Sequence, residues 1–200
     1  MADMIKDFKT MQQELKLDGT ELCRLAQDFR QTAEDALAGR DSSLSALHTY
    51  LGLPTGQETG TFMALDFGGT NVRASRITLK GADGFTIETK VAKPLRSDDY
   101  DYTTSSTTAE ALFDFIARIV KEAAGGNKAY KLGFTFSFAV NQTSAKDASL
   151  IAWSKEIDVP GVAGKSINGL LKEALVRNGM DRIEPVALLN DTTATLLSSV

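Results

Sequence analysis

Two stretches near the amino terminus place apolar residues at helical intervals. Residues 4–17 and 19–37 each carry one apolar stripe, which predicts two amphipathic helices with Asp18 as the N-cap of the second. The stripes consist of Ile5, Phe8, Met11, Leu15, Leu22, Leu25, Phe29, Ala33 and Leu37. Gly39 is placed to end the second helix, and residues 42–51 are expected to add a short helical turn.

A different pattern follows a loop rich in glycine and proline. Short apolar or alternating runs at residues 62–67, 72–79 and 85–91 are separated by glycine turns, so we expect three successive strands in a meander. The polar, acidic segment 97–108 comes next. We interpret it as a solvated loop and assign it no function.

The second half of the chain alternates between helix and strand. A strongly amphipathic helix is expected from Ala109 to the glycines at 125 and 126, followed by a strand over 130–140. A helix over 162–177 and a buried strand over 185–189 come next, before a threonine-rich segment of helical character. This order predicts a mixed sheet with helices on its faces, in which right-handed helical crossovers join the parallel strands.

Composition narrows the possible partners. The 200 residues have 42% hydrophobic content and a net charge of −4, with 22 basic and 26 acidic residues interspersed. We therefore expect no nucleic-acid partner. We find neither a signal peptide nor an apolar run of membrane-spanning length, so we expect a cytoplasmic protein with no membrane partner. Because Cys23 and His48 are the only residues of their types, chemistry must rest on carboxylates, lysine and backbone.

The segment FMALDFGGTNVR, residues 62–73, is typical of a phosphate-binding turn. An apolar strand ends near Asp66, and Gly68 and Gly69 then bare the backbone so that successive N–H groups can bind an anion. Thr70 adds a hydroxyl, and Asp66 is placed to face a metal ion carried by the phosphate. The alternative is a plain hairpin with a Gly-Gly turn.

A carboxylate follows the last predicted strand. Asp191 comes directly after Asn190, where partial desolvation would suit it to accept a proton from a bound hydroxyl. The alternative is a helix N-cap or Asx turn. Ligands of such sheets bind beyond the carboxyl ends of strands, so we expect the segments around Asp66, Ser137 and Asp191 to converge on one cleft.

Two further segments carry residues with possible chemical roles. Ser154 and Lys155 offer a hydroxyl and a cation for a polyol or an anionic group, although Lys155 and Glu156 could equally form a surface pair. GVAGKS, residues 161–166, is similar to a P-loop, but its glycines are too closely spaced. We interpret it as a glycine-rich lead into a helix that is capped near Gly164.

Three motifs taken together resemble the hexokinase family of sugar kinases, within the actin-like ATPase superfamily. They are ALDFGGTNVR, LGFTFSF followed by WSK, and LLNDT, and they occur in the family's order. The resemblance implies an actin-like ATPase (ribonuclease H-like) mixed sheet with flanking helices. It also implies that residues 43–200 form the small lobe and that the helices of residues 1–42 pack on a second lobe. With that lobe missing from these residues, we expect the helices to self-associate.

The resemblance also implies roles for individual residues. The proposed sugar-binding residues are Ser137, Ser154, Lys155, Asn190 and Asp191. Asp191 would also take the proton from the 6-hydroxyl of a glucose-type hexose. Asp66 would approach Mg²⁺, directly or through water, and the ATP phosphates would face Gly68, Gly69, Thr70 and Asn71. Arg73 matches the family pattern with two open roles, a phosphate contact or a structural ion pair.

The chain departs from the family in two respects. Ala139 stands where many relatives have proline, and the chain ends shortly after Asp191, where relatives continue into the second lobe. We therefore expect these residues alone to be incomplete for catalysis. The alternatives are a non-catalytic sugar-binding or regulatory module, a bacterial-type glucokinase of the wider superfamily, and an ATPase lobe without a sugar substrate.

Overall fold

The structure is a computed structural model that describes residues 10–11, 16–46 and 48–199. Internal contacts divide the chain into two units, residues 1–48 and residues 49–200, which are described separately. Most of the helix expected over residues 4–17 lies outside the described residues, of which residues 10–11 are helical and residues 16–17 are not. None of the described helices is long and apolar enough to cross a membrane.

In the first unit, α2 (Gly19–Leu37) confirms the second predicted helix. Asp18 caps it through a reciprocal pair of hydrogen bonds: the Asp18 carboxylate accepts from Glu21 N at 2.8 Å, and the Glu21 carboxylate accepts from Asp18 N at 3.0 Å. No residue of α2 is buried among the described residues, and Phe29 is 66% exposed. Self-association through this stripe stays a prediction.

The short helical turn expected over residues 42–51 is wrong for the described residues, which form bends and coil. The Ser42 hydroxyl donates to the Thr32 carbonyl at 2.8 Å and accepts from Leu44 N at 3.2 Å. Such local side-chain bonds compete with the hydrogen bonds of a helix.

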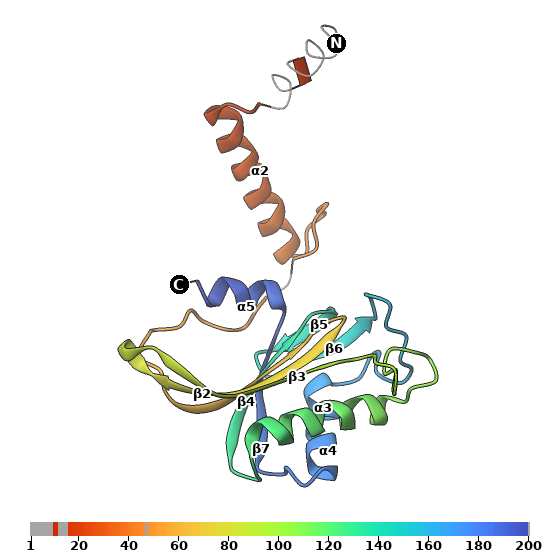
Figure 1. Ribbon diagram of the computed structural model, residues 1–200. Coiled ribbons are helices and arrows are strands. Elements are labelled where there is room, and N and C mark those ends of the chain that lie inside the picture. The colour runs from red at the N-terminus through yellow and green to blue at the C-terminus, as the bar shows by residue number, and fades with distance from the viewer. Residues whose placement is uncertain (1–9, 12–15, 47, 200) are drawn as a thin grey trace, which may run out of the picture. The chain divides into compact units, whose positions relative to one another are not determined.

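The second unit is built on a five-stranded sheet (Figure 1). Its strands are β1 (Thr59–Phe67), β2 (Asn71–Lys80), β3 (Phe85–Pro94), β4 (Tyr130–Phe136) and β7 (Ile183–Leu189). Their order is β3-β2-β1-β4-β7, with β1, β2 and β3 antiparallel and with β4 and β7 parallel to β1. The predicted meander and mixed sheet are confirmed. A 3₁₀ turn, η1 (Gly81–Asp83), joins β2 to β3.

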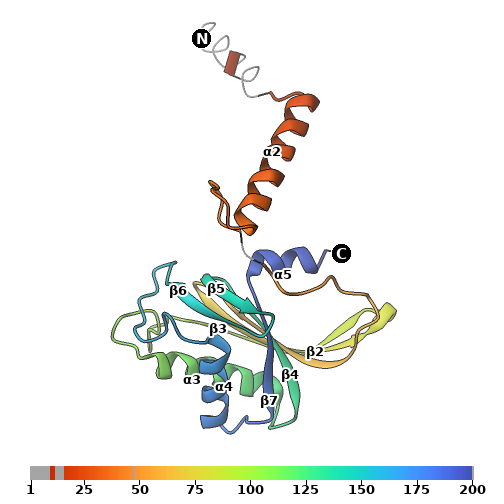
Figure 2. The ribbon, with the colours of Figure 1, turned by 180° about the vertical axis from the view of Figure 1, so that it is seen from behind.

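Two helices, α3 (Ala109–Ala124) and α4 (Ile167–Arg177), cover one face of this sheet, as Figures 1 and 2 show. The apolar face of α3 is fully buried, and Gly125 ends the helix in the left-handed conformation. The expected start of α4 is corrected. Ser166 is the N-cap, and its hydroxyl accepts from Gly169 N at 2.8 Å, whereas Gly164 has a φ of 75° and lies outside the helix.

The strand expected over residues 130–140 is wrong in its second part. β4 ends at Phe136, and after Ser137 and Phe138 the chain enters β5 (Ala139–Ser144), which pairs with β6 (Asp147–Ala152) in a separate two-stranded sheet. The main-chain bond from Ser137 N to Phe67 O, at 3.2 Å, lies just beyond the paired strand ends. Ser137 therefore stands at a break between two sheets.

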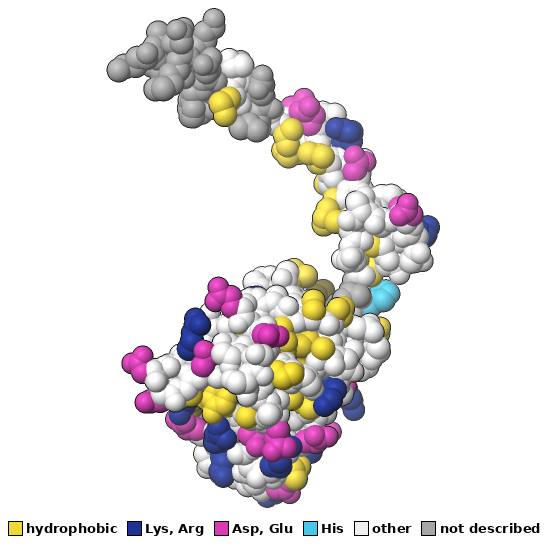
Figure 3. All heavy atoms as spheres, turned by 90° about the vertical axis from the view of Figure 1, so that its right-hand side faces the viewer, with side chains coloured by type: hydrophobic (Ala, Val, Ile, Leu, Met, Phe, Trp, Pro, Cys, Tyr) yellow, Lys and Arg dark blue, Asp and Glu magenta, His cyan; other side chains and the backbone are white. Residues whose placement is uncertain are grey.

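The surface of this unit carries both signs of charge. In the face shown in Figure 3, basic and acidic side chains alternate over residues 49–200, with apolar side chains scattered between them.

The last helix, α5 (Asp191–Leu197), follows β7 directly and lies on the side of the sheet opposite α3 and α4 (Figures 1 and 2). Its start therefore stands at the carboxyl end of β7.

Candidate active site

The predicted site segments follow three neighbouring parallel strands. Asp66 lies near the carboxyl end of β1, Ser137 directly follows β4, and Asp191 follows β7. Because β1, β4 and β7 are adjacent and parallel, these ends share one edge of the sheet. Neighbouring strands lie about 4.8 Å apart, so the chain near Asp66 and the chain near Asp191 are separated by about 10 Å across the sheet. A small ligand spans that distance.

An aromatic cluster supports this edge. Phe67, Phe136, Phe138 and Trp153 pack edge to face or tilted, with ring centroids 4.9 Å apart for Phe138 and Trp153 and 5.2 Å apart for Phe67 and Phe138. The Trp153 indole N–H donates to the Val159 carbonyl at 2.7 Å. The cluster fixes the backbone on both sides of Ser137 and directly before Ser154. Ser137 itself is buried, at 7% exposure.

Asp66 is paired with Arg73. The two residues stand opposite each other in the β1–β2 register, and Arg73 Nη1 lies 2.8 Å from Asp66 Oδ2. Both side chains are about two-fifths exposed, so solvent screens this pair and its contribution to stability is small. The main effect of this ion pair is to orient the Asp66 carboxylate. The Arg73 guanidinium holds one carboxylate oxygen, and the other oxygen has no hydrogen bond among the described residues.

The glycine turn closes the hairpin between β1 and β2. Gly68 N donates to Asn71 O at 3.1 Å, whereas the N–H groups of Gly69 and Thr70 have no acceptor within the described part of the chain. Thr70 O accepts from Leu95 N at 2.9 Å, which joins the turn to the end of β3. The turn is thus a hairpin turn that also leaves two adjacent donors unpaired, the arrangement that binds anions.

Lys155 lies directly against this turn. A Cβ built on Gly69 would stand 2.6 Å from Lys155 Cβ and 2.7 Å from Lys155 Cδ, so only glycine fits without displacing the lysine. The Lys155 ammonium lies 5.4 Å from the centre of the Phe138 ring. No ion pair between Lys155 and Glu156 is present among the described residues, and the surface pair considered above does not form.

The backbone at Lys155 and Glu156 is strained. Both residues adopt left-handed conformations, with φ of 59° and 64°, which side chains other than glycine, asparagine or aspartate rarely do. Single residues of this kind cost on the order of 1–3 kcal/mol and persist where the surrounding structure enforces them. Here the Trp153 side of the loop is anchored in the aromatic cluster, and Asp158 N donates to the Thr103 carbonyl at 2.7 Å.

Asn190, and not Asp191, is the N-cap of α5. Its side chain accepts from Thr192 N at 3.0 Å, and Asp191 is the first residue of the helix. The Asp191 carboxylate also accepts from Thr192 N, at 2.8 Å, and gains from the helix dipole at this end. The partial desolvation expected for Asp191 is wrong for the described residues, because α5 buries none of its side chains and Asp191 is exposed.

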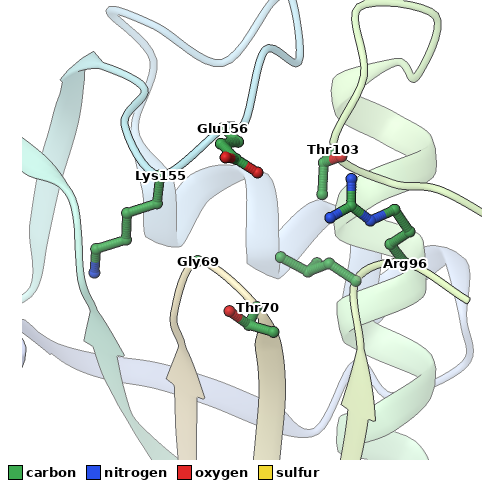
Figure 4. A pocket seen from close by; sticks show the side chains of 7 residues that line it. Gly69, Thr70, Arg96, Thr103, Lys155 and Glu156 are labelled. Atoms are coloured by element: carbon green, nitrogen blue, oxygen red, sulfur yellow. The ribbon is translucent and has the colours of Figure 1, made fainter.

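A pocket of about 680 Å³ opens beside the turn (Figure 4). It is lined by Gly69, Thr70, Leu95, Arg96, Thr103, Lys155 and Glu156. The sequence alone does not predict Arg96, Thr103 or Glu156 as site residues, and Thr103 lies in the segment 97–108, for which the sequence predicts only a solvated loop. The meander contains a signal for Arg96, because the third strand of a meander runs parallel to the first and ends at the same edge of the sheet. Arg96 directly follows the end of β3 and therefore lies at the edge where β1 ends.

The loop between β3 and α3 is internally braced at the pocket wall. The Asp101 carboxylate accepts from the Thr103 hydroxyl at 2.5 Å and from Thr103 N at 2.8 Å. These bonds, helped by the charge of Arg96, hold the pKa of Asp101 below its usual value. Asp101 is therefore ionised at neutral pH and keeps Thr103 in place.

The mixed sheet with its flanking helices matches solved hexokinase structures and has the actin-like ATPase fold. A sequence model described as hexokinase matches residues 7–200, and the chain belongs to the hexokinase family. The predicted fold class and family are thereby confirmed.

Individual relatives agree with the family. Hexokinase-1 of Schizosaccharomyces pombe is 39% identical over 155 residues, which cover 74% of this chain and 31% of the relative. Hexokinase-2 of Candida albicans is 30% identical over 205 residues, covering 98% of this chain and 41% of the relative. The chain thus spans between about a third and two-fifths of the length of these curated relatives. They do not favour a bacterial-type glucokinase.

Solved structures give the same fold. A crystal structure of a hexokinase superimposes with a TM-score of 0.79 at 34% identity, over 92% of this chain and 45% of that chain. The hexokinase of Schistosoma mansoni complexed with glucose superimposes with a TM-score of 0.67 at 31% identity, over 85% of this chain and 39% of that chain.

Proposed function

We propose that this chain forms the sugar-binding side of an ATP-dependent hexose kinase, which phosphorylates a glucose-type hexose at its 6-hydroxyl. The observation that carries the proposal is the contact of Lys155 with Gly69, which joins the WSK segment to the glycine turn. The shared sheet edge adds Ser137, Asn190 and Asp191 to the same region. The glucose complex of the Schistosoma mansoni hexokinase supports the choice of sugar.

The hydroxyl and amide side chains orient the sugar in this proposal. Ser137, Ser154, Asn190 and the Lys155 ammonium bind sugar hydroxyls, and the Asp191 carboxylate takes the proton of the reacting one. The hydroxyl oxygen bonds to the terminal phosphorus as the bond between that phosphorus and the leaving ADP oxygen breaks. Little beyond alignment and charge neutralisation is required of the protein. Asp191 is exposed among the described residues and is therefore open to such a substrate.

Asp66 and the glycine turn fit the nucleotide and its Mg²⁺. Magnesium is usually held by one or two carboxylates together with water and substrate phosphates, and its bound charge would neutralise the phosphate oxygens. The described residues hold no cluster of three or more metal-ligating side chains, and Asp66 has one carboxylate oxygen outside its ion pair. The unpaired N–H groups of Gly69 and Thr70 suit phosphate oxygens, with Asn71 next in the turn.

Titration of glucose into the 200-residue chain tests the sugar site. We expect saturable binding that weakens at least tenfold in Asp191→Ala, because a hydrogen bond to a charged group contributes about 1.5–3 kcal/mol. Asp83→Ala is the matched control, since Asp83 is an exposed carboxylate in the η1 turn at the opposite end of β2. Failure of the wild-type chain to bind glucose, or equal affinity in Asp191→Ala, would contradict a sugar site built on these residues.

We further propose that phosphoryl transfer needs groups beyond these 200 residues, since the match covers only 31% and 30% of the length of two curated relatives. The purified chain is expected to show no ADP release above background with glucose, ATP and Mg²⁺ in a coupled assay. Turnover that co-purifies with the chain and disappears in Asp191→Ala would show that the chain is catalytically complete.

A further inference from the structure

Gln142 occupies an inward-facing position of the two-stranded sheet formed by β5 and β6. Along β5, exposed residues alternate with Val140, which is buried, and with Gln142 and Ser144, which are half-buried. A polar side chain at such a position needs hydrogen-bond partners. Gln142 Nε2 has two, because it donates to Ser144 O at 3.0 Å and to Leu188 O of β7 at 2.8 Å. This side chain therefore ties the two-stranded sheet to β7.

The bond to Leu188 closes part of the open edge of the five-stranded sheet. Among the described residues β7 is the last strand in the sheet order and pairs only with β4, so its other edge faces away from the sheet. Leu188 has no exposed surface. Its carbonyl accepts from Gln142, and its N–H donates to Ala145 O at 3.0 Å. Both main-chain groups of this buried residue are thus satisfied from the turn between β5 and β6.

The segment held in this way leads directly into the proposed sugar-binding residues. β7 ends at Leu189, Asn190 is the N-cap of α5, and Asp191 is the first residue of that helix. Only one residue therefore separates Leu188 from Asn190. A bond that fixes the main chain at Leu188 also fixes the point from which the side chains of Asn190 and Asp191 project. Side chains held in place before binding lose less freedom when a ligand binds.

We propose that Gln142 is a positioning residue for the sugar site. By donating to the Leu188 carbonyl, it holds the end of β7 so that Asn190 and Asp191 are oriented to bind the sugar. The role of those two side chains rests on the proposed function. The hold on β7 rests only on the hydrogen bonds of Leu188. Gln142 acts through the main chain of β7 and does not touch the sugar.

Calorimetric titration of glucose into the 200-residue chain gives the first readout. Gln142→Ala removes the donor, whereas Gln142→Glu keeps the size of the side chain but, at a pH of about 8, presents a carboxylate that only accepts. We expect both variants to bind glucose about tenfold more weakly than the wild-type chain, because a buried carbonyl left without its donor is costly. Asn141→Ala is the matched control, since Asn141 is the adjacent residue of β5 and is exposed. We expect this variant to keep the wild-type affinity.

Amide hydrogen exchange gives a second readout that does not depend on the sugar. In both Gln142 variants the amide hydrogens of residues 188–194 should exchange at least about tenfold faster than in the wild-type chain, because the end of β7 opens locally. Those of α3, which lies elsewhere on the sheet, should stay within about threefold of the wild-type rates. A residue that only stabilised the fold as a whole would speed exchange equally in both places.

The outcomes separate this proposal from the sugar site itself. Wild-type glucose affinity in Gln142→Glu, or faster exchange spread evenly over β7, α5 and α3, would overturn the positioning role. If the wild-type chain does not bind glucose, the proposed sugar site falls and hydrogen exchange alone decides the role of Gln142. Selective acceleration at residues 188–194 then supports its hold on β7, and the lack of such acceleration overturns it.

Discussion

Replacing Phe136 with alanine is expected to lower the free energy of unfolding by about 3–5 kcal/mol, the usual cost of deleting a fully buried aromatic ring. Phe136 has no exposed surface, and its ring contacts those of Phe67, Phe134, Phe138 and Trp153. The cavity left by the truncation would open beneath the residues that flank Ser137. Urea unfolding followed by circular dichroism measures the change directly.

Phe85→Ala is the control for this experiment. Phe85 begins the edge strand β3 and is 64% exposed, so its removal should change the free energy of unfolding by about 0.5 kcal/mol or less. Equal losses in the two variants would show that the aromatic cluster is not the part of the core that stabilises this unit.

Gly69→Ala is expected to weaken glucose binding by a factor on the order of 10 to 100, because overpacking costs about 1–3 kcal/mol. The new methyl group would stand 2.6 Å from Lys155 Cβ. A Cβ atom cannot rotate away as the end of a side chain can, and Lys155 already has a strained backbone. The lysine, or the whole loop that carries it, must therefore shift. Calorimetric titration with glucose measures the effect.

Gly133→Ala controls for the effect of adding a methyl group. Gly133 lies in β4, and a Cβ built there meets no atom within 4 Å. We expect this variant to bind glucose as the wild-type chain does. Wild-type affinity in Gly69→Ala, with unfolding unchanged, would show that the position of Lys155 is not set by the glycine turn.

Periodicity was enough to predict much of this fold. The strands of the meander and α3 have strong repeats and clear glycine boundaries, and each formed close to its expected range. The break at Ser137 was not predictable in the same way, because the apolar pattern continues through Phe138 and Val140 into the next strand. At this point the choice of hydrogen-bonding partner depends on tertiary structure, and the local pattern of apolar residues does not predict it.

The candidate site was predictable to a similar extent. Asp66 and Asp191 could be placed because each stands at the end of an apolar strand. Arg96 was missed because its importance depends on the direction of β3, which brings an otherwise ordinary loop to the pocket. The left-handed backbone at Lys155 and Glu156 was also missed, since neither residue type favours that conformation.

The strand order has a consequence for how the protein folds. Strands β1, β2 and β3 pair with their neighbours in sequence, whereas the pairing of β1 with β4 brings Met63 to Leu132 and must close a long loop. Local hairpins form in microseconds, and contacts between distant segments are slower. Ser137 and Asp191 reach the sheet edge beside Asp66 only through those distant pairings. The meander and its glycine turn are thus expected to form early, and the site is completed when the last parallel strand docks.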